Sequence, residues 1–168
     1  MSAIGKASGK IILMGEHSVV YGQPAIAMPF SAVEIIAKVT AQGEALSVDC
    51  DFYKGLVHKM PKIWESLKHA IRFSLYRIGA PTDPAIHIKI SSTIPAERGM
   101  GSSAAVAVAV ARALFAHYEK ILTDKELWEI VQSSEKIAHG NPSGIDAATT
   151  SGKSPVFFIK NQPMEPLE

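Results

Sequence analysis

The spacing of hydrophobic and polar residues divides the chain into short strands and longer helices. Apolar runs or regular alternation predict strands at Lys10–Met14, Val33–Thr40, Ile86–Ser91 and Val156–Lys160. Apolar side chains recur every three or four residues over 62–78, which predicts an amphipathic helix that ends at Gly79.

Helix signals dominate the second half of the chain. An alanine- and valine-rich run over 102–118 predicts a buried helix. Thr123 and Glu126 have the spacing of a capping box, so a further helix is expected over 124–138. Residues 145–150 can form another helix. The mixed order of strands and helices predicts an α+β or α/β layered domain.

The composition is that of an ordinary globular domain. The chain has 168 residues, of which 47% are hydrophobic and 20% charged, so disordered and fibrous classes are excluded. A net charge of +1 predicts no nucleic-acid partner. No apolar stretch reaches the ~18 residues of a membrane span, so no membrane partner is expected. The single cysteine, Cys50, cannot form an intramolecular disulfide and fits a reducing cytoplasm.

A first motif, Gly9–Gly22, combines a lysine with an acid–histidine pair. Lys10 begins an apolar strand, and Glu16 and His17 follow in a polar turn. A lysine in a buried strand requires a partner for its charge. The alternative is a lysine at the strand edge whose long side chain reaches solvent.

A second motif, Pro95–Ala105, places Gly99 and Gly101 directly before a helix that starts at Ser102 or Ser103. Glycine lets the backbone approach a ligand closely, and a helix N-terminus offers free N–H groups that suit phosphate. The two hydroxyls can contact phosphate or a hydrated metal. The alternative is a turn with a serine N-cap.

A third motif, Glu135–Asp146, places two carboxylates around a glycine-containing loop. Glu135 lies on the apolar side of its predicted helix, where a carboxylate is unfavourable unless it is paired or binds a cation. Packing at the edge of that face is the alternative. Asp146 follows the loop at a predicted helix start, where capping is a common role of aspartate. Together the three motifs suggest phosphoryl transfer, which needs a phosphate cradle, oxygen ligands for Mg²⁺, a cation and an acid that activates an alcohol.

The three motifs resemble those of mevalonate kinases in the GHMP kinase superfamily. The resemblance extends from about Lys6 to about Lys160, and the motifs over 9–22 and 139–146 are its more specific part. It implies an α+β domain over 1–168, the two-layer, ribosomal-protein-like N-terminal domain of a GHMP kinase. It also implies phosphorylation of the primary hydroxyl of mevalonate to 5-phosphomevalonate in isoprenoid biosynthesis, with ATP as cosubstrate and Mg²⁺ as cofactor.

The resemblance implies a role for each residue of the reacting centre. Asp146 matches the catalytic aspartate, the base for the C5 hydroxyl of mevalonate. Lys10 matches the catalytic lysine that favours the alkoxide and the aspartate anion. Ser103 and Glu135 match the Mg²⁺ ligands of the family.

The resemblance also implies binding residues. His17, with Glu16 beside it, matches a histidine near the carboxylate end of the substrate. Arg98 replaces a small residue of many relatives and can either touch phosphate or face water. The phosphate-binding segment corresponds to Pro95, Arg98, Gly99, Met100, Gly101, Ser102, Ser103 and Ala104.

The C-terminal end departs from the family pattern. Family members carry a second domain with a third glycine-rich motif, and this sequence has no similar motif. We therefore expect an N-terminal domain alone, which associates with a missing C-terminal domain or forms a homodimer. Two other interpretations stay open. One is another GHMP small-molecule kinase, such as a phosphomevalonate kinase, and the other is a non-catalytic nucleotide-binding fragment.

Overall fold

The computed structural model describes residues 2–93, 102–163 and 165–167. Its strands are β1 (Ser2–Met14), β2 (Ala25–Thr40), β3 (Ser47–Cys50), β4 (Tyr53–Leu56), β5 (His87–Ser92), β6 (Val156–Phe158) and β7 (Glu165–Pro166). Its α-helices are α1 (Glu65–Ile78), α2 (Ser102–His117), α3 (Asp124–His139) and α4 (Ile145–Ser151). Short 3-10 helices occupy Ser18–Tyr21, Val57–Lys59 and Lys62–Trp64.

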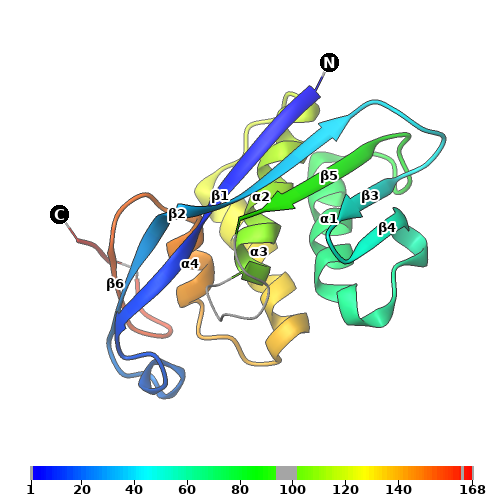
Figure 1. Cartoon of the computed structure of the whole chain (residues 1–168). Helices are drawn as coiled ribbons and strands as arrows, with labels where there is room; N and C mark the ends of the chain where they lie inside the picture. The colour runs from blue at the N-terminus through cyan, green and yellow to red at the C-terminus, as the bar shows by residue number, and fades with distance from the viewer. Residues whose placement is uncertain (1, 94–101, 164, 168) are drawn as a thin grey trace.

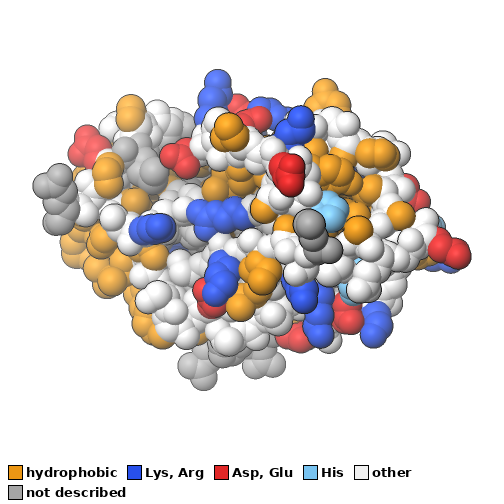
Figure 2. All heavy atoms as spheres, turned by 90° about the horizontal axis from the view of Figure 1, so that it is seen from above, with side chains coloured by type: hydrophobic (Ala, Val, Ile, Leu, Met, Phe, Trp, Pro, Cys, Tyr) orange, Lys and Arg blue, Asp and Glu red, His pale blue; other side chains and the backbone are white. Residues whose placement is uncertain are grey.

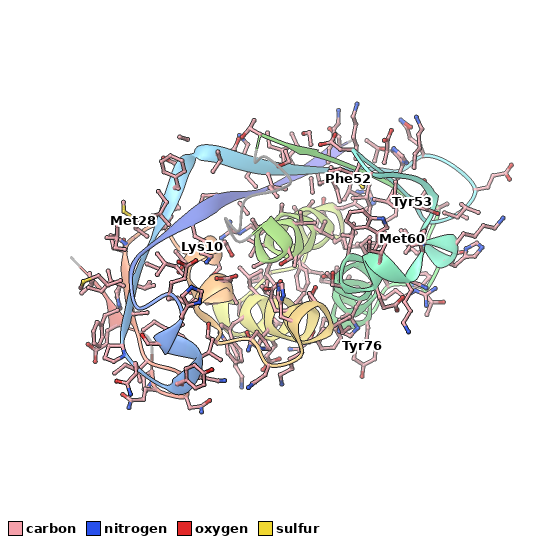
Figure 3. All side chains as sticks on the ribbon, turned by 60° about the horizontal axis from the view of Figure 1, so that its bottom comes forward. Lys10, Met28, Phe52, Tyr53, Met60 and Tyr76 are labelled. Atoms are coloured by element: carbon pink, nitrogen blue, oxygen red, sulfur yellow. The ribbon has the colours of Figure 1, made fainter. Side chains whose placement is uncertain are left out.

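The strands form one sheet, and the helices lie together on one of its faces (Figures 1 and 3). The strand order is β4-β3-β5-β2-β6-β7, and β1 pairs with the remaining edge of β2. All neighbouring strands are antiparallel except β3 and β5, which are parallel. The prediction of a two-layer α+β domain is confirmed.

Strands β1 and β2 form a long ribbon that changes register near its middle. Ser8 pairs with Glu34 and Gly9 with Phe30, so residues 31–33 of β2 have no partner on β1. On one side of this shift β2 pairs with β5, and on the other side it pairs with β6. A register shift of this kind redirects a strand. It places Lys10 at the junction of two parts of the sheet.

Two hydrophobic clusters correspond to these two parts. The larger lies between the sheet and helices α1–α3, with Ile71, Ile88, Leu114 and Ile130 among its fully buried side chains. The smaller joins β2, β6 and α4 and contains Val19, Ala25, Ala27, Ile145, Ala148, Val156 and Phe158. Helix α4 therefore contributes to both clusters, with Ala147 in the larger and Ile145 and Ala148 in the smaller.

Helix α2 crosses β1 at very close range. A Cβ atom on Gly5 would collide with the carbonyl oxygen of Ala109, so the helix backbone rests directly on the strand. The small side chains over 104–113 of α2 are almost all buried and make this approach possible. The alanine-rich run is thus a packing feature that brings the second half of α2 close to the ribbon.

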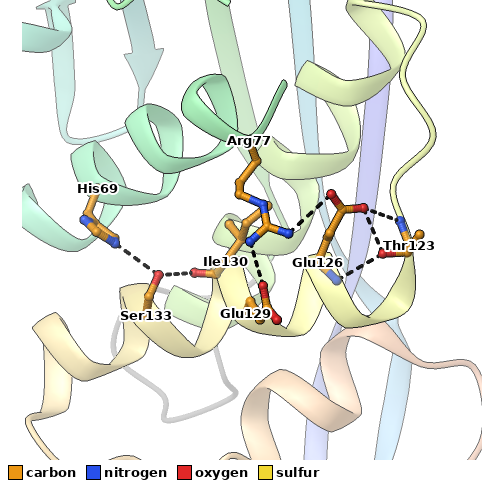
Figure 4. Close-up of polar contacts among 7 residues, drawn as sticks. All are labelled: His69, Arg77, Thr123, Glu126, Glu129, Ile130 and Ser133. Carbon is orange, nitrogen blue, oxygen red and sulfur yellow. Dashed lines mark hydrogen bonds and ion pairs between the residues drawn. The ribbon is translucent and has the colours of Figure 1, made fainter. Parts of the chain in front are cut away.

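Arg77 of α1 joins helix α3 through two carboxylates (Figure 4). Arg77 Nη1 donates to Glu129 Oε2 at 2.7 Å, and Nη2 donates to Glu126 Oε1 at 3.4 Å. Further along the same pair of helices, His69 Nε2 lies 3.0 Å from Ser133 Oγ. Polar contacts on the surface thus align α3 with α1.

Most of the predicted elements are confirmed, with altered bounds. The capping box forms, since Thr123 Oγ1 accepts a hydrogen bond from the backbone N–H of Glu126 at 3.2 Å. The helix expected over 62–78 begins with a 3-10 turn and continues as α1. Strands β3 and β4 were not predicted, because four residues are too few to establish a period.

The surface is mixed in character. Seen from above, side chains of both charges are interspersed, and hydrophobic side chains gather at the lower left of the view (Figure 2). At the end of β1 and in the following turn, Leu13, Met14 and Tyr21 are 56%, 63% and 84% exposed. In the described residues, no helix has the length and hydrophobicity needed to cross a membrane.

Candidate active site

The ammonium group of Lys10 is buried and paired with a carboxylate. Lys10 Nζ lies 2.8 Å from Asp146 Oδ1, and the two side chains are 7% and 29% exposed. Lys10 projects from β1 toward the helical layer (Figure 3). Because a buried ammonium requires an opposite charge, this pair couples β1 to α4. The alternative of a solvent-reaching Lys10 is wrong.

Backbone geometry at the start of α4 sets the position of Asp146. Gly144 is the N-cap residue with φ 96°, a conformation that favours glycine, and a Cβ there would lie 3.3 Å from the Phe158 ring. Ser143 Oγ accepts a hydrogen bond from the N–H of Ile145 at 3.3 Å. The N-cap residue itself, Gly144, has no side chain that could cap α4. The carboxylate of Asp146 pairs with Lys10 and does not cap the helix.

Glu135 is a buried carboxylate on α3, near the Lys10–Asp146 pair. Its side chain is 2% exposed, and Oε1 has no hydrogen-bond partner in the described part of the chain. Glu135 Oε2 lies 3.5 Å from His139 Nε2, which is 3.4 Å from Ser103 Oγ on the first turn of α2. Packing at the edge of the apolar face is therefore the wrong interpretation of Glu135.

Burial raises the pKa of Glu135 above its ordinary value. The hydroxyl of Ser103 and the charges of His139 and Lys10 oppose this rise, whereas the nearby carboxylate of Asp146 adds to it. A buried carboxylate with an unused oxygen is unfavourable unless a cation or donor reaches it. The arrangement thus leaves Glu135 ready to accept a ligand.

These groups face one cavity of about 410 Å³. Its charged or titratable lining residues are Lys10, Glu16, Glu135, His139 and Asp146. In the described part of the lining, three carboxyl groups against one ammonium group favour a cation. The cavity is large enough for a small polar substrate beside that cation.

A second, apolar cavity of about 430 Å³ lies near the start of α2. Its lining includes Ile35, Leu67 and the rings of Phe52 and Trp64, which stack with centroids 5.5 Å apart. Ser103 also lines this cavity and contacts His139 of the polar cavity. The N-terminal turn of α2 is therefore close to both. The sequence reasoning missed this cavity because the hairpin of β3 and β4, whose turn lines it, was not predicted.

Arg112 is a structural residue that the motifs did not reveal. Its Nη1 donates to the carbonyl of Lys6 and its Nη2 to the carbonyl of Ser151, both at 2.7 Å. Burial lowers the pKa of Arg112. The guanidinium thus joins β1 to the end of α4, the two elements that carry Lys10 and Asp146.

Of the remaining predicted site residues, some lie at the polar cavity, some lie away from it, and others lie outside the described residues. Glu16 lines the polar cavity, whereas His17 is exposed and is not among the residues that line it. Ser102 begins α2, and Ala104 is buried in the core. The other members of the expected phosphate-binding segment lie outside the described residues: Pro95, Arg98, Gly99, Met100 and Gly101.

The described residues can supply two ligands to a magnesium ion, but not a complete coordination shell. Among the described residues, no group of three or more His, Cys, Asp and Glu side chains could hold a metal ion. Mg²⁺ in phosphate sites commonly uses one or two protein ligands and completes its shell with water and phosphate oxygens. The Ser103 hydroxyl and the unpartnered oxygen of Glu135 fit that role.

The segment that carries all four α-helices matches a known family. Residues 63–153 match the GHMP kinases N terminal domain. This chain belongs to the GHMP kinases. It is 32% identical to mevalonate kinase of Pyrococcus horikoshii, over 98% of this chain and 53% of that protein. The chain spans about half the length of the curated relatives it matches.

Solved GHMP kinase structures share the fold of the chain. Mevalonate kinase of Methanococcus jannaschii has a TM-score of 0.85 at 24% identity, covering 100% of this chain and 56% of that one. Mevalonate kinase of methicillin-resistant Staphylococcus aureus has a TM-score of 0.72 at 38% identity, covering 99% and 55%. The GHMP fold therefore extends over the whole chain, beyond the family match.

Proposed function

We propose that this GHMP kinase chain is the nucleotide-binding half of an enzyme that transfers the γ-phosphoryl group of ATP to the primary hydroxyl of mevalonate. The buried Lys10–Asp146 pair, in a cavity that also contains Glu135, is the observation that carries the proposal. The substrate assignment is supported by relatives named mevalonate kinase.

Asp146 and Lys10 activate the alcohol in this proposal. Asp146 accepts the hydroxyl proton while the alcohol oxygen forms a bond to the γ-phosphorus and the bond to the β-phosphate bridging oxygen breaks, so ADP leaves. Lys10 stabilises both the aspartate anion and the negative charge that develops on the attacking oxygen. Burial of the pair strengthens these electrostatic interactions because little water competes for them.

Ser103 and Glu135 hold Mg²⁺ in this proposal. When bound, the ion neutralises charge on the phosphate oxygens during transfer. His139 lies between the two ligands and positions them through its contacts with both side chains. Glu135 gains a partner for its unpartnered oxygen, which relieves the unfavourable burial of its charge.

The apolar cavity is suited to the base of the nucleotide. The stacked rings of Phe52 and Trp64 offer a surface for a planar ring. Ser103 also lines this cavity and contacts His139 of the polar cavity, so the phosphates can extend from one cavity toward the other. The first turn of α2 presents free N–H groups to the phosphates. Glu16 lines the polar cavity, and His17 stays a prediction for the carboxylate end of mevalonate.

The charge of the polar cavity favours mevalonate over an acceptor that already carries phosphate. A phosphorylated acceptor needs added basic residues, but the described lining of the cavity has one lysine against three carboxyl groups. This observation disfavours the phosphomevalonate kinase alternative.

Calorimetry with Mg-ATP and an ADP-release assay over a panel of alcohols test the proposal. The 168-residue chain should bind Mg-ATP weakly, and a chimaera with the C-terminal half of the Pyrococcus horikoshii relative should release ADP preferentially with mevalonate. Preference for phosphomevalonate would select the other kinase. Nucleotide binding by the chimaera without turnover of any alcohol would favour a non-catalytic fragment.

A further inference from the structure

A third cavity, of about 460 Å³, shares a wall with the candidate active site. The shared wall consists of Gln132 on α3 and the loop residues Asn141, Pro142 and Ser143. The proposed reaction uses none of these four residues as a catalytic group or ligand. We call this space the outer cavity.

The outer cavity has the opposite charge to the candidate active site. Lys136 and Lys160 line it, and its lining contains no carboxylate in the described part of the chain. Lys160 Nζ lies 3.1 Å from Asn141 Oδ1 and 3.5 Å from the carbonyl of Val20, which leaves a third N–H donor. Lys136 forms no ion pair with any described residue. Two lysines without a carboxylate favour an anion.

One side of the outer cavity is apolar. Trp128, Ala148 and Phe158 line it, and the Trp128 side chain is 45% exposed although it lies on the α3 face that borders the cavity. Gln132 adds a buried amide oxygen that has no hydrogen-bond partner among the described residues. An aromatic wall and two cations are features of a site for a small anion.

We propose that the outer cavity binds a small anion that has a phosphate or carboxylate head and a short apolar body. The head lies between the ammonium groups of Lys136 and Lys160, and the body contacts Trp128. The described charged residues of the two cavities differ, since the outer cavity has two lysines and the candidate active site has Lys10 with carboxyl groups.

Fluorescence of Trp128 tests this proposal. The chain has two tryptophans, so Trp64→Phe leaves Trp128 as the sole reporter. Hexyl phosphate and hexanoate are titrated separately to distinguish the two head groups, with hexanol and inorganic phosphate as controls. We expect saturable binding of at least one hexyl anion, weakened by added salt because exposed charges are screened.

Three lysine variants locate the binding. Lys136→Gln and Lys160→Gln should each weaken binding of the hexyl anion roughly tenfold, the scale of one charged hydrogen bond. Lys120→Gln, an exposed lysine outside the cavity, is the matched control and should leave binding unchanged. Circular dichroism verifies that each variant is folded.

Several results would overturn the proposal. If hexanol binds as tightly as hexyl phosphate, the anionic head is not needed for binding. If inorganic phosphate binds as tightly as hexyl phosphate, the apolar body is not needed. Either result contradicts the proposed ligand class. Binding that is insensitive to both Lys136→Gln and Lys160→Gln would place the ligand elsewhere. Failure of every probe to change Trp128 fluorescence would reject the site.

Discussion

The acidic side chains at the two ends of helix α3 differ in burial and in hydrogen bonding. Near the N-terminus, Glu126 and Glu129 are partly exposed and both pair with Arg77. Near the C-terminus, Glu135 is 2% exposed and has one oxygen without a hydrogen-bond partner among the described residues. Hydrogen bonds from Thr123 lower the pKa of Glu126, whereas burial raises the pKa of Glu135.

This difference separates a stabilising arrangement from one that is suited to binding. At the N-terminal end, both carboxylates accept hydrogen bonds from Arg77, and these bonds align α3 with α1. A buried and incompletely satisfied carboxylate destabilises the fold until a ligand arrives. The same residue type on one helix therefore has two physical roles, and the following substitutions separate them.

The largest effect is expected at the reacting centre. In the active chimaera, Asp146→Asn should reduce turnover by a factor on the order of 10²–10⁴, because the amide cannot accept the hydroxyl proton. Mg-ATP affinity should remain nearly unchanged, and calorimetry measures it. Loss of nucleotide binding with unchanged residual turnover would contradict the assignment of Asp146 as base.

Two arginines provide the next test, because Arg77 pairs with the N-terminal end of α3 and Arg112 joins the elements that carry Lys10 and Asp146. Arg112→Met should destabilise the chain by about 2 kcal/mol, since the carbonyls of Lys6 and Ser151 lose a charged donor. Arg77→Met should have a smaller effect because its partners are partly exposed. Urea denaturation compares the two. A larger loss for Arg77→Met would show that the surface network is the more important one.

Metal dependence tests the proposed role of the C-terminal end of α3. Glu135→Gln should raise the Mg²⁺ concentration for half-maximal activity of the chimaera roughly tenfold, because an amide oxygen lacks the charge that Mg²⁺ prefers. Ser103→Ala should act in the same direction. Glu129→Gln is the matched control on the same helix. Wild-type Mg²⁺ dependence in both site variants would make Glu135 a structural residue.

The smallest effect is a difference in the pH dependence of stability. The pKa of Glu135 is higher in the folded than in the unfolded chain, so the folded state holds the proton more tightly. Its contribution to stability is present below the unfolded pKa and is lost as the pH rises through the folded pKa. Without Mg²⁺, Glu135→Gln should remove this loss and stabilise the chain at pH 8 by on the order of 1 kcal/mol.

The matched variant should behave in the opposite way. Glu129→Gln removes a partner of Arg77 and should slightly destabilise the chain at pH 8. Urea denaturation of both variants between pH 4 and pH 8 measures the contrast. Equal destabilisation by the two substitutions would show that Glu135 is satisfied in the folded chain.

Local signals in the sequence predicted the helices well. The capping box of Thr123 and Glu126 is a contact within one turn, and the apolar period over 62–78 depends only on which face is buried. The same local reasoning identified Lys10 and Glu135 as residues whose charge needed a partner, whereas it offered helix capping as a common role for Asp146. The family resemblance connected them to one reaction before their distances were known.

Pairing between distant segments decided what local patterns could not. Strands β1 and β2 extend beyond their predicted bounds because hydrogen bonds to neighbouring strands stabilise segments with weak intrinsic signals, including one that contains Pro29. Strands β3 and β4 likewise exist through pairing with each other and with β5.

The sequence by itself determined the types of residue at the site and the helices that carry Glu135 and Asp146. Only the tertiary structure decided that Lys10 meets Asp146, that Arg112 joins their two elements, and that charge separates two cavities across one wall. The physical reason is that burial and electrostatic pairing depend on distances between segments far apart in the chain. Such distances arise when the ribbon, α2 and α4 come together in one fold.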